Sequence, residues 1–558
     1  MSHWIEEAVV YHIYPLGFCG CEQFNSDAPE KSINRIEKLL EWMTHLKYIN
    51  VNTIYLGPVF ESVEHGYDTT DYITIDRRLG SNDDFTKVCS LLHENSFRIV
   101  LDGVFNHIGR DHFAFKDIIE NGQSSKYCGW ISGLNFNCRS PYNDHFSYEG
   151  WNGCYNLVKL NLNNPEVTDY LLSAIKVWIQ NWDIDGIRFD AADCLTDEFI
   201  KKVHTFTKSL KPDFWLVGEI IHGNYGKWAN DEMFDSVTNY QCYKGIYSSH
   251  NDRNYFEIAH SIEYQNNQYG NLYLYNFLDN HDVSRIASVL KNQDHIYCCY
   301  TLLFMMKGIP SIYYGSEFGI MGLKGQGVNA DVQIRPCIEL YDIPSRDERL
   351  LKHISALGSI RQSSIPVQIG SFENVDLKNQ TFLFKREYND EIVYIGLNIS
   401  DDEYTFNFDT KYRRLADRLT GKHYDTINGR ASITVSQNCS IILVCDELKE
   451  NGTSFNYVPN KTEEKTDVIE NVSLNNIITP SVGIPEGRKI VLGGHYKHFK
   501  GGDYVVLNVA KDHETLEEQV VYMAIYDKPT IWVRPLNMFL EDVDDHGNIK
   551  PRFTYIPD

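Results

Sequence analysis

Short strand-like runs alternate with amphipathic helical stretches from residue 9 to about residue 360, and this alternation limits the possible folds more than any other feature of the chain. Successive strand–helix–strand units place their strands in parallel and cover the sheet with helices. The runs span residues 9–16, 53–60, 97–105, 186–192, 214–221, 236–241, 272–279 and 311–317. Eight such runs predict a closed (β/α)8 TIM barrel of the α/β class, with its active site at the carboxyl ends of the strands.

Changes in composition predict further domains. Residues 108–160, rich in Gly, Asn, Tyr and Trp, are far longer than the usual loop of about 2–6 residues, so we expect an inserted domain within a catalytic domain of residues 1–361. Residues 362–446 alternate apolar and polar positions, as in an antiparallel β-sandwich. The polar stretch 447–483 is typical of a linker, and residues 484–558 form a small β-rich domain.

Charge and targeting signals exclude several classes of partner. Lys and Arg total 52 against 76 Asp and Glu, a formal net charge of −24, which disfavours nucleic acids and anionic membranes. The start, MSHWIEEAVVYHIYPLGF, lacks the features of a signal peptide, and no apolar stretch is long enough to span a membrane. Thirteen scattered cysteines without zinc-like spacing favour a reducing compartment. We therefore expect a cytoplasmic protein with a neutral substrate.

Charged side chains gather at the predicted strand ends. Taken singly, Asp190 paired with Arg188 would be a structural ion pair, Glu219 a barrel-rim acid, and Asp282 a helix cap. Taken together, like charges at one rim destabilise a fold unless they serve a function. The third, fourth, fifth and seventh runs contribute Asp102, Asn106 and His107, then Arg188 and Asp190, then Glu219, and finally His281 and Asp282.

Glycoside cleavage with retention needs such a set. One ionised carboxylate attacks the anomeric carbon, and one protonated carboxyl about 5–5.5 Å away donates to the leaving oxygen. Arg188, two residues before Asp190, shares its face of the strand and is expected to keep that carboxylate ionised. Glu219 lies in an apolar run, where it is placed to retain a proton as a general acid.

Four motifs, DGVFNH, GIRFDAADC, VGEI and FLDNHD, occur in this order at predicted strand ends. Together they resemble those of the α-amylase family, glycoside hydrolase family 13, and the resemblance covers residues 4–446. It implies that the insertion is domain B, that 362–446 is the C-terminal sandwich, and that Asp190 is the nucleophile, Glu219 the acid/base and Asp282 the transition-state stabiliser.

The resemblance also implies a substrate-binding set. Arg188, His107 and His281 match ligands of sugar hydroxyls, and Tyr67 in HGYDTTDY matches an aromatic platform. The remaining members are Asp68, Asp102 and Asn106 as supporting residues and Arg335, which with Asp331 in DVQIRP resembles a loop that reaches the non-reducing sugar. The chemistry needs no cofactor. Asn106 stands where many members ligate a structural calcium ion, which makes it a candidate metal ligand here.

The stretch LVKLNLNNPEV is similar to a signature of the neopullulanase, cyclomaltodextrinase and maltogenic amylase group, although a loop leading into a helix at Pro165 is an alternative. The chain departs from that group by entering its first strand at residue 9, without the group's N-terminal domain. It also has Asp193 and Cys194 after the nucleophile, where the group has Asn-Glu, which leaves hydrolysis against transfer open. Trp130, Trp151 and Trp228 are candidates for sugar stacking or for core packing.

The sequence thus predicts a retaining enzyme that cleaves α-1,4 bonds, with α-1,6 bonds as a further candidate, in maltodextrins or cyclodextrins. A 4-α-glucanotransferase or another α-glucosidase is the enzymatic alternative, and a catalytically silent glucan-binding module is the non-enzymatic one. The expected partner is an α-glucan oligosaccharide; oligomeric state stays open. Residues 484–558 resemble a small bacterial domain of unknown function.

Overall fold

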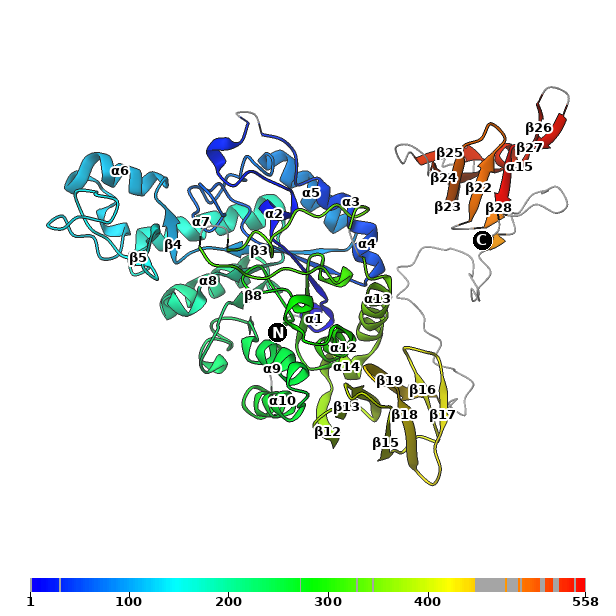
Figure 1. The fold of residues 1–558 in the computed structure, drawn as a ribbon. Coiled ribbons are helices and arrows are strands. Elements are labelled where there is room, and N and C mark those ends of the chain that lie inside the picture. Colours follow the sequence, from blue (N-terminus) through cyan, green and yellow to red (C-terminus); the bar gives the residue numbers. More distant parts are fainter. Residues whose placement is uncertain are drawn as a thin grey trace. The chain divides into compact units, whose positions relative to one another are not determined.

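The computed structural model describes residues 3–29, 32–270, 272–327, 330–343, 346–446, 477–478, 490–491, 494–511, 517–524, 531–545 and 548–556. The chain divides into two compact units, Met1–Pro459 and Asn460–Asp558. Figure 1 labels the elements of both units.

A barrel of eight parallel strands forms the centre of the first unit. The hydrogen-bonded order is β10-β11-β1-β2-β3-β7-β8-β9, and a parallel bridge between Thr238 and Tyr275 joins the two ends of this sheet. The predicted (β/α)8 barrel is therefore confirmed. The strands are β1 (Val10–Ile13), β2 (Thr53–Leu56), β3 (Arg98–Gly103), β7 (Gly186–Phe189), β8 (Trp215–Gly218), β9 (Ser236–Val237), β10 (Tyr275–Phe277) and β11 (Ile309–Tyr313).

The last strand ends earlier than the sequence predicts. The expected run of 311–317 becomes β11, which ends at Tyr313, and a 3-10 helix, η7 (Ser316–Phe318). Gly315 between them has φ 84°, a left-handed conformation that breaks the strand.

Helices cover the outside of the barrel, and several of them begin with side-chain caps. α5 starts with a capping box between Ser81 and Asp84, and α7 starts at Pro165 after the Asn164 cap. LNNPEV therefore does lead into a helix. The helices are α1 (His3–Glu7), α2 (Pro15–Phe18), α3 (Lys38–Glu41), α4 (Met43–Tyr48), α5 (Asn82–Glu94), α7 (Pro165–Trp182), α8 (Asp197–Leu210), α9 (Tyr240–Asn251), α10 (Phe256–Tyr269), α11 (Ile286–Val289), α12 (Ile296–Met305), α13 (Glu348–Ser363) and α14 (Ile365–Ile369).

The insertion after β3 folds around its own small sheet. β4 (His107–Gly109), β6 (Cys154–Lys159) and β5 (Gly150–Trp151) pair antiparallel in the order β4-β6-β5, with α6 (Phe113–Asn121) beside them. Trp130 is 6% exposed, packs against neighbouring aromatic rings, and donates its indole N–H to Glu166 at 3.1 Å. Core packing, rather than sugar stacking, therefore accounts for Trp130.

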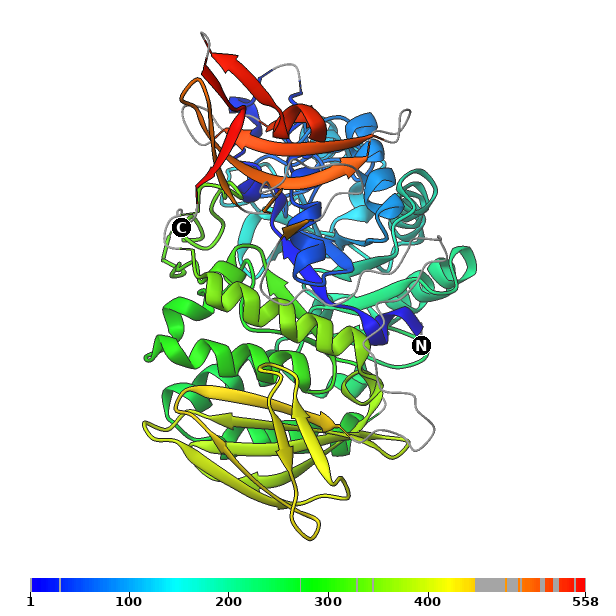
Figure 2. The same cartoon turned by 90° about the vertical axis from the view of Figure 1, so that its right-hand side faces the viewer.

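Antiparallel strands follow the barrel. Six form a sheet in the order β12-β13-β14-β19-β16-β17, which faces the pair β15-β18. Figure 2 shows helices of the α12–α14 region between these yellow strands and the barrel, and the predicted 361/362 boundary lies inside α13. The strands are β12 (Ser371–Leu377), β13 (Thr381–Tyr388), β14 (Glu391–Asn398), β15 (Tyr404–Asp409), β16 (Arg414–Asp417), β17 (His423–Asp425), β18 (Arg430–Val435) and β19 (Cys439–Cys445).

The second unit is β-rich. Its five-stranded antiparallel sheet has the order β25-β24-β23-β22-β28, with β22 (His495–His498), β23 (Asp503–Lys511), β24 (Glu518–Ala524), β25 (Ile531–Pro535) and β28 (Phe553–Ile556). α15 (Leu536–Leu540) packs into its core. β20 (Ile477–Ile478) pairs with β21 (Ile490–Val491), and β26 (Asp542–Asp545) with β27 (Asn548–Pro551). The predicted linker 447–483 lies outside the described residues except for β20.

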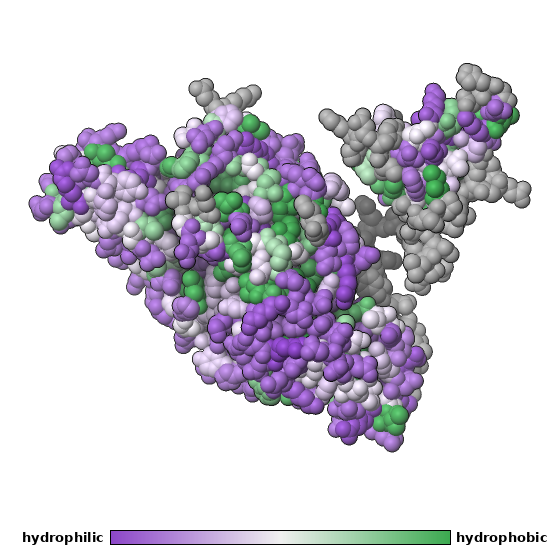
Figure 3. Space-filling view, in the orientation of Figure 1, coloured by the Kyte–Doolittle hydropathy of each residue, from purple (hydrophilic) through white to green (hydrophobic). Residues whose placement is uncertain are grey.

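Surface hydropathy and helix length complete the description. On the face of the first unit drawn in Figure 3, hydrophobic residues gather near the centre and hydrophilic residues cover the surrounding surface. Within the described part of the chain, no helix has the length and apolar character needed to cross a membrane.

Candidate active site

One guanidinium joins acidic groups from three neighbouring barrel strands. Arg188 on β7 stands opposite Asp102 of β3 in the sheet and donates from Nη1 to Asp102 Oδ1 at 2.9 Å. The same nitrogen lies 3.0 Å from Asp190 Oδ1, and Nη2 lies 2.8 Å from Glu219 Oε1. The Arg188 side chain is only 5% exposed, so these ion pairs are formed away from water. The predicted convergence at the strand ends is thus present.

Asp190 is buried beside other acids. Burial raises its pKa well above the usual range; Arg188 opposes this effect, while the nearby Glu219 and Asp102 carboxylates add to it. We expected Arg188 to keep this carboxylate ionised, but one cation shared by three acids does not outweigh burial and like charge. Burial and the neighbouring acids therefore make loss of the Asp190 proton harder than in an exposed aspartate.

The turn after Asp190 places a donor on Glu219. Ala191 adopts φ 44°, a left-handed conformation that is uncommon for a residue with a side chain. Its N–H donates to Glu219 Oε2 at 3.1 Å, while the Tyr240 hydroxyl donates to Oε1 at 3.3 Å. The Asn280 amide donates in turn to the Tyr240 oxygen at 3.2 Å. Tyr240 was not among the predicted site residues, because nothing in its local sequence separates it from the many tyrosines of the chain.

Asp282 is surrounded by cationic and ring nitrogen groups. Its carboxylate lies 2.9 Å from His281 Nε2 and 2.9 Å from Arg335 Nη2, and Lys324 Nζ lies 3.9 Å away. Burial alone would raise the pKa of Asp282, but these three neighbours hold it well below its usual range. Asp282 is therefore an anion at neutral pH, and its side chain, 35% exposed, is accessible to a ligand.

Tyr67 and His107 complete the wall around the acids. The Tyr67 hydroxyl donates to Asp102 Oδ2 at 3.1 Å and is hydrogen-bonded to His281 Nε2, whose ring lies parallel to that of Tyr67 at 5.4 Å. His107 Nε2 lies 4.0 Å from Asp190 Oδ2. Burial lowers the pKa of His107 to about 3, so this ring is neutral at physiological pH.

Two predicted residues lie outside this constellation. Asp68 accepts backbone N–H groups of Glu64 at 2.9 Å and His65 at 3.2 Å, so it supports the loop that carries Tyr67. Asn106 is 1% exposed, and its amide is hydrogen-bonded to His107 Nδ1 at 3.2 Å. Asp68 therefore affects the site through the loop of Tyr67, and Asn106 affects it through His107.

The surroundings of Asn106 fit a calcium ion poorly. Its backbone oxygen already accepts from Leu160, and both oxygens of Asp144, a candidate acid of the insertion, pair with Arg110 at 2.8 Å. Calcium prefers several free oxygen ligands. Among the residues that the structure describes, no cluster of three or more His, Cys, Asp or Glu side chains could hold a metal ion.

A pocket of about 590 Å³ opens over the acids. Asp190, Asp282, Tyr67, His107 and Arg335 all line it, and Trp151 contributes a ring that lies 5.6 Å from that of His107. Apart from Asp331, which the motif DVQIRP already indicates beside Arg335, its other walls were not predicted, because they come from loops whose positions depend on contacts distant in sequence. These walls are formed by Tyr14, Leu16, Gly17, Gly20, Cys21, Glu22, Gln23, Glu64, His65, Leu157, Asp331, Val332, Pro336 and Cys337.

The other expected recognition residues are placed differently. Trp228 is 8% exposed within the core, whereas Trp151 is half-buried at the pocket. Asp193 and Cys194 are exposed after the Ala191 turn and do not line the pocket.

Comparisons with known proteins agree with this geometry. Residues 35–355 match the model of the α-amylase catalytic domain, and residues 494–555 match a protein family of unknown function (DUF1653). The chain is 29% identical over 423 residues to a cyclomaltodextrinase of Thermoanaerobacter pseudethanolicus, covering 72% of this chain and 71% of that protein. It is 28% identical over 471 residues to neopullulanase 2 of Thermoactinomyces vulgaris, covering 79% and 78%.

A solved structure shares the fold. The cyclic α-maltosyl-(1→6)-maltose hydrolase of Arthrobacter globiformis is 25% identical, with a TM-score of 0.68, and the alignment covers 79% of this chain and 99% of that chain. The barrel, its inserted domain and the matched catalytic domain together show that the chain belongs to the α-amylase family of glycoside hydrolases.

Proposed function

We propose that the protein is a retaining hydrolase that cleaves α-glucosidic bonds of maltodextrins or cyclodextrins through a covalent glycosyl-enzyme on Asp190. The observation that carries this proposal is the shared Arg188, which lies 3.0 Å from Asp190, a residue of the pocket lining, and 2.8 Å from Glu219 on the neighbouring strand end. Two carboxyl groups held in this way suit a nucleophile and an acid/base on the same glycosidic bond.

The reaction proceeds in two displacements. Asp190 attacks the anomeric carbon as the bond to the leaving oxygen breaks, and the proton of Glu219 passes to that oxygen. A water molecule then gives its proton to Glu219 and attacks the same carbon, which releases Asp190. Because burial and the neighbouring carboxylates raise the pKa of Asp190, substrate binding must favour the state in which Asp190 is ionised and Glu219 carries the proton.

The remaining residues stabilise the sugar between these steps. Asp282 is held as an anion by Arg335 and His281, and its charge suits the developing oxocarbenium ion. Neutral His107 and the Tyr67–His281 pair offer hydrogen-bonding groups and an aromatic face to the hydroxyls and ring of that sugar. None of these steps requires a metal ion or an organic cofactor.

The names of the relatives support the substrate class. A cyclomaltodextrinase and a neopullulanase align over most of this chain, which favours α-1,4 bonds of linear and cyclic glucans. A hydrolase of cyclic α-maltosyl-(1→6)-maltose and a debranching enzyme of Nostoc punctiforme share the fold at 25% and 26% identity, which makes α-1,6 bonds a second candidate. Asp193 and Cys194 replace the Asn-Glu pair of the relatives' group, so transfer to another sugar stays the alternative to hydrolysis.

Time-resolved product analysis on maltoheptaose, β-cyclodextrin, pullulan and panose tests the proposal, with Asp190→Asn as the control. We expect ring opening and short maltooligosaccharides, with α-anomers detected first by NMR, and a loss of at least about 1,000-fold in the variant. Products longer than the substrate identify a transferase. Release of products from none of the four, with retained binding, identifies a silent glucan-binding module.

A further inference from the structure

Two loops from different barrel strands form one wall of the pocket. Residues 21–23 follow β1 and α2, and residues 64–65 follow β2. The Asn25 N–H donates to the Val63 oxygen at 2.8 Å, and the Gln23 amide donates to Glu64 Oε1 at 2.9 Å. The two loops are therefore joined directly, at the backbone and at the surface.

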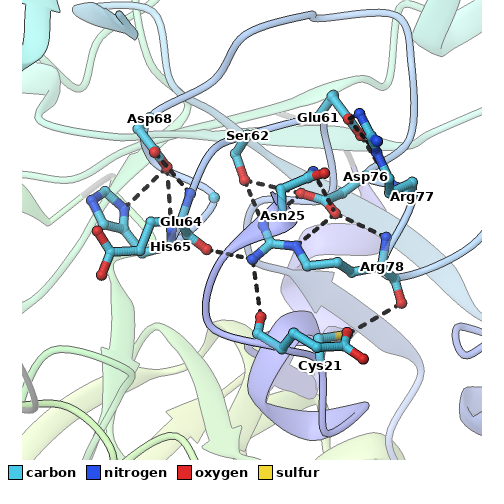
Figure 4. A network of polar contacts seen from close by, with 12 residues as sticks. Cys21, Asn25, Glu61, Ser62, Glu64, His65, Asp68, Asp76, Arg77 and Arg78 are labelled. Atoms are coloured by element: carbon cyan, nitrogen blue, oxygen red, sulfur yellow. Dashed lines mark hydrogen bonds and ion pairs between the residues drawn. The ribbon is translucent and has the colours of Figure 1, made fainter. Parts of the chain in front are cut away.

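A single buried guanidinium lies behind both loops. Arg78, 1% exposed, donates from Nη1 to the backbone oxygens of Glu22 at 3.1 Å, Gln23 at 2.9 Å and Glu64 at 2.7 Å (Figure 4). These oxygens belong to three residues that line the pocket. Because a guanidinium is rigid and planar, its contacts to one loop fix the position of the other.

The other side of the same guanidinium is bonded to Asp76, two residues earlier in the chain. Arg78 Nε and Nη2 donate to the two oxygens of Asp76 at 2.8 and 2.7 Å, and Nη2 also donates to Ser62 Oγ at 2.8 Å. Ser62 and Asn25 donate in turn to Asp76 at 3.0 and 3.4 Å. Arg78 and Asp76 thus form one buried cluster with Asn25 and Ser62, which lie two residues from the two loops (Figure 4).

The catalytic acids do not depend on this cluster. Arg188 holds Asp190 and Glu219, and Arg335 holds Asp282. Among the described residues, the side-chain hydrogen bonds of Arg78 go to wall carbonyls, Asp76 and Ser62, and to none of the three acids. A change in Arg78 therefore alters where the sugar-binding wall lies and leaves the reacting groups in place.

We propose that Arg78 is a positioning residue that sets the affinity of the pocket for an oligosaccharide, by clamping the loops 21–23 and 64–65 into one wall. This inference deepens the proposed function and rests on it for the identity of the ligand. It assigns to Arg78 an effect on KM and on binding, with little effect on the chemical step.

The test compares a double variant, Arg78→Met with Asp76→Asn, with the adjacent Arg77→Met. The double variant removes both buried charges together, so that neither is left unpaired. Arg77 is a matched control, since its ion pair with Glu61 at 2.8 Å is half-exposed and does not reach the pocket wall (Figure 4). Thermal melts and circular dichroism establish that each variant is folded. A further variant, Arg78→Lys, shows how much of the wild-type affinity a positive charge restores without the planar guanidinium.

We expect the double variant to raise KM for maltoheptaose about tenfold, with kcat within about threefold of the wild type, because a displaced wall costs binding contacts. Calorimetric binding of maltoheptaose, measured in the Asp190→Asn background so that no sugar is cleaved, should weaken by a similar factor, whereas Arg77→Met stays within about twofold. Arg78→Lys should rescue only part of the loss.

Unchanged KM and unchanged binding in a folded double variant overturn the inference, as does an equal loss in both variants. A fall in kcat with KM unchanged assigns Arg78 to the chemical step and also overturns it. Because binding is measured without turnover, a wild-type protein that binds maltoheptaose but does not cleave it contradicts the proposed hydrolysis while the role of Arg78 is still decided by the binding data. If the wild type does not bind maltoheptaose, both proposals are overturned.

Discussion

At the residue scale, the active centre contains more acid than its cations neutralise. Arg188 pairs with three carboxylates, and Asp190 among them retains a raised pKa because it is buried beside Glu219 and Asp102. A carboxyl whose folded-state pKa exceeds its unfolded value binds more protons when folded. Its stabilising contribution is complete below the unfolded pKa of about 3.9 and is lost as the pH rises through the folded pKa.

Replacing Asp190 by Asn should therefore stabilise the protein in a pH-dependent way. The variant removes a charge that the folded state disfavours at neutral pH, and Arg188 keeps Asp102 and Glu219 as partners. We expect Tm at pH 7 to rise by about 1–3 °C, and the difference from the wild type to shrink toward pH 4. Calorimetry from pH 4 to pH 8 measures this. A lower Tm at pH 7, or a difference independent of pH, contradicts the assignment.

Tyr240 connects the acid/base to the strand end that carries Asp282. Its hydroxyl donates to Glu219 and accepts from Asn280, whose Oδ1 accepts the Asp282 N–H at 2.8 Å. Tyr240→Phe should lower kcat about tenfold with little change in KM, because Glu219 loses a hydrogen bond that orients it. Steady-state kinetics on maltoheptaose measure the effect. Tyr243→Phe on the same helix, stacked on Phe277, is the control and should behave as the wild type; equal kinetics of both variants would exclude this role for Tyr240.

At the element scale, an ion pair ties the two ends of the insertion together. Arg110 follows β4, and Asp144 precedes β5; their side chains form two hydrogen bonds of 2.8 Å, which lower the pKa of Asp144. The Arg110 guanidinium also lies 4.2 Å from the centre of the Tyr142 ring. This pair occupies both oxygens of Asp144, a candidate calcium ligand, so a side-chain ion pair holds this part of the insertion.

The insertion should consequently be stable without calcium. Dialysis against EDTA should leave Tm unchanged within about 1 °C, while Arg110→Met lowers it by about 2–4 °C because Asp144 loses its partner. Arg139→Met is a matched control in the same insertion, since its contact with Asn143 is exposed. A lower Tm in EDTA that returns to its original value when Ca²⁺ is added would show that a metal ion contributes to stability.

How far the sequence predicts this protein depends on the range of the contacts. The eight strands and the gathering of Asp102, Arg188, Asp190 and Glu219 follow from local patterns, because parallel strands end at one face. The role of Arg78 cannot be predicted from local patterns, since its partners lie up to 56 positions away in the sequence. Nothing in the local sequence separates it from the adjacent Arg77. The charge state of Asp190 depends on burial, which spacing does not measure.

At the scale of the whole molecule, each unit has its own core. The core of the first unit runs from the barrel into the sandwich and includes Phe382, Ile395 and Ile442. The second unit is built around Tyr496, Tyr522, Phe539 and Phe553, within a separate cluster of buried side chains. Units with separate cores unfold separately unless their interface is large.

A chain that ends after Asp446 should therefore fold and retain full activity. β19 (Cys439–Cys445) lies between β14 and β16 and must be kept, and Asp446 pairs with Arg414 at 3.1 Å and His423 at 2.5 Å. We expect kcat and KM on maltoheptaose to match the full-length values and the main calorimetric transition to stay within about 1 °C. A chain ending at residue 438 is the control: it lacks β19, exposes the facing surfaces of two strands, and should not fold. If the chain that ends after Asp446 loses affinity for oligosaccharides while its Tm is unchanged, the second unit takes part in glucan binding. In that case the catalytic core is intact and only a contribution to binding has been removed.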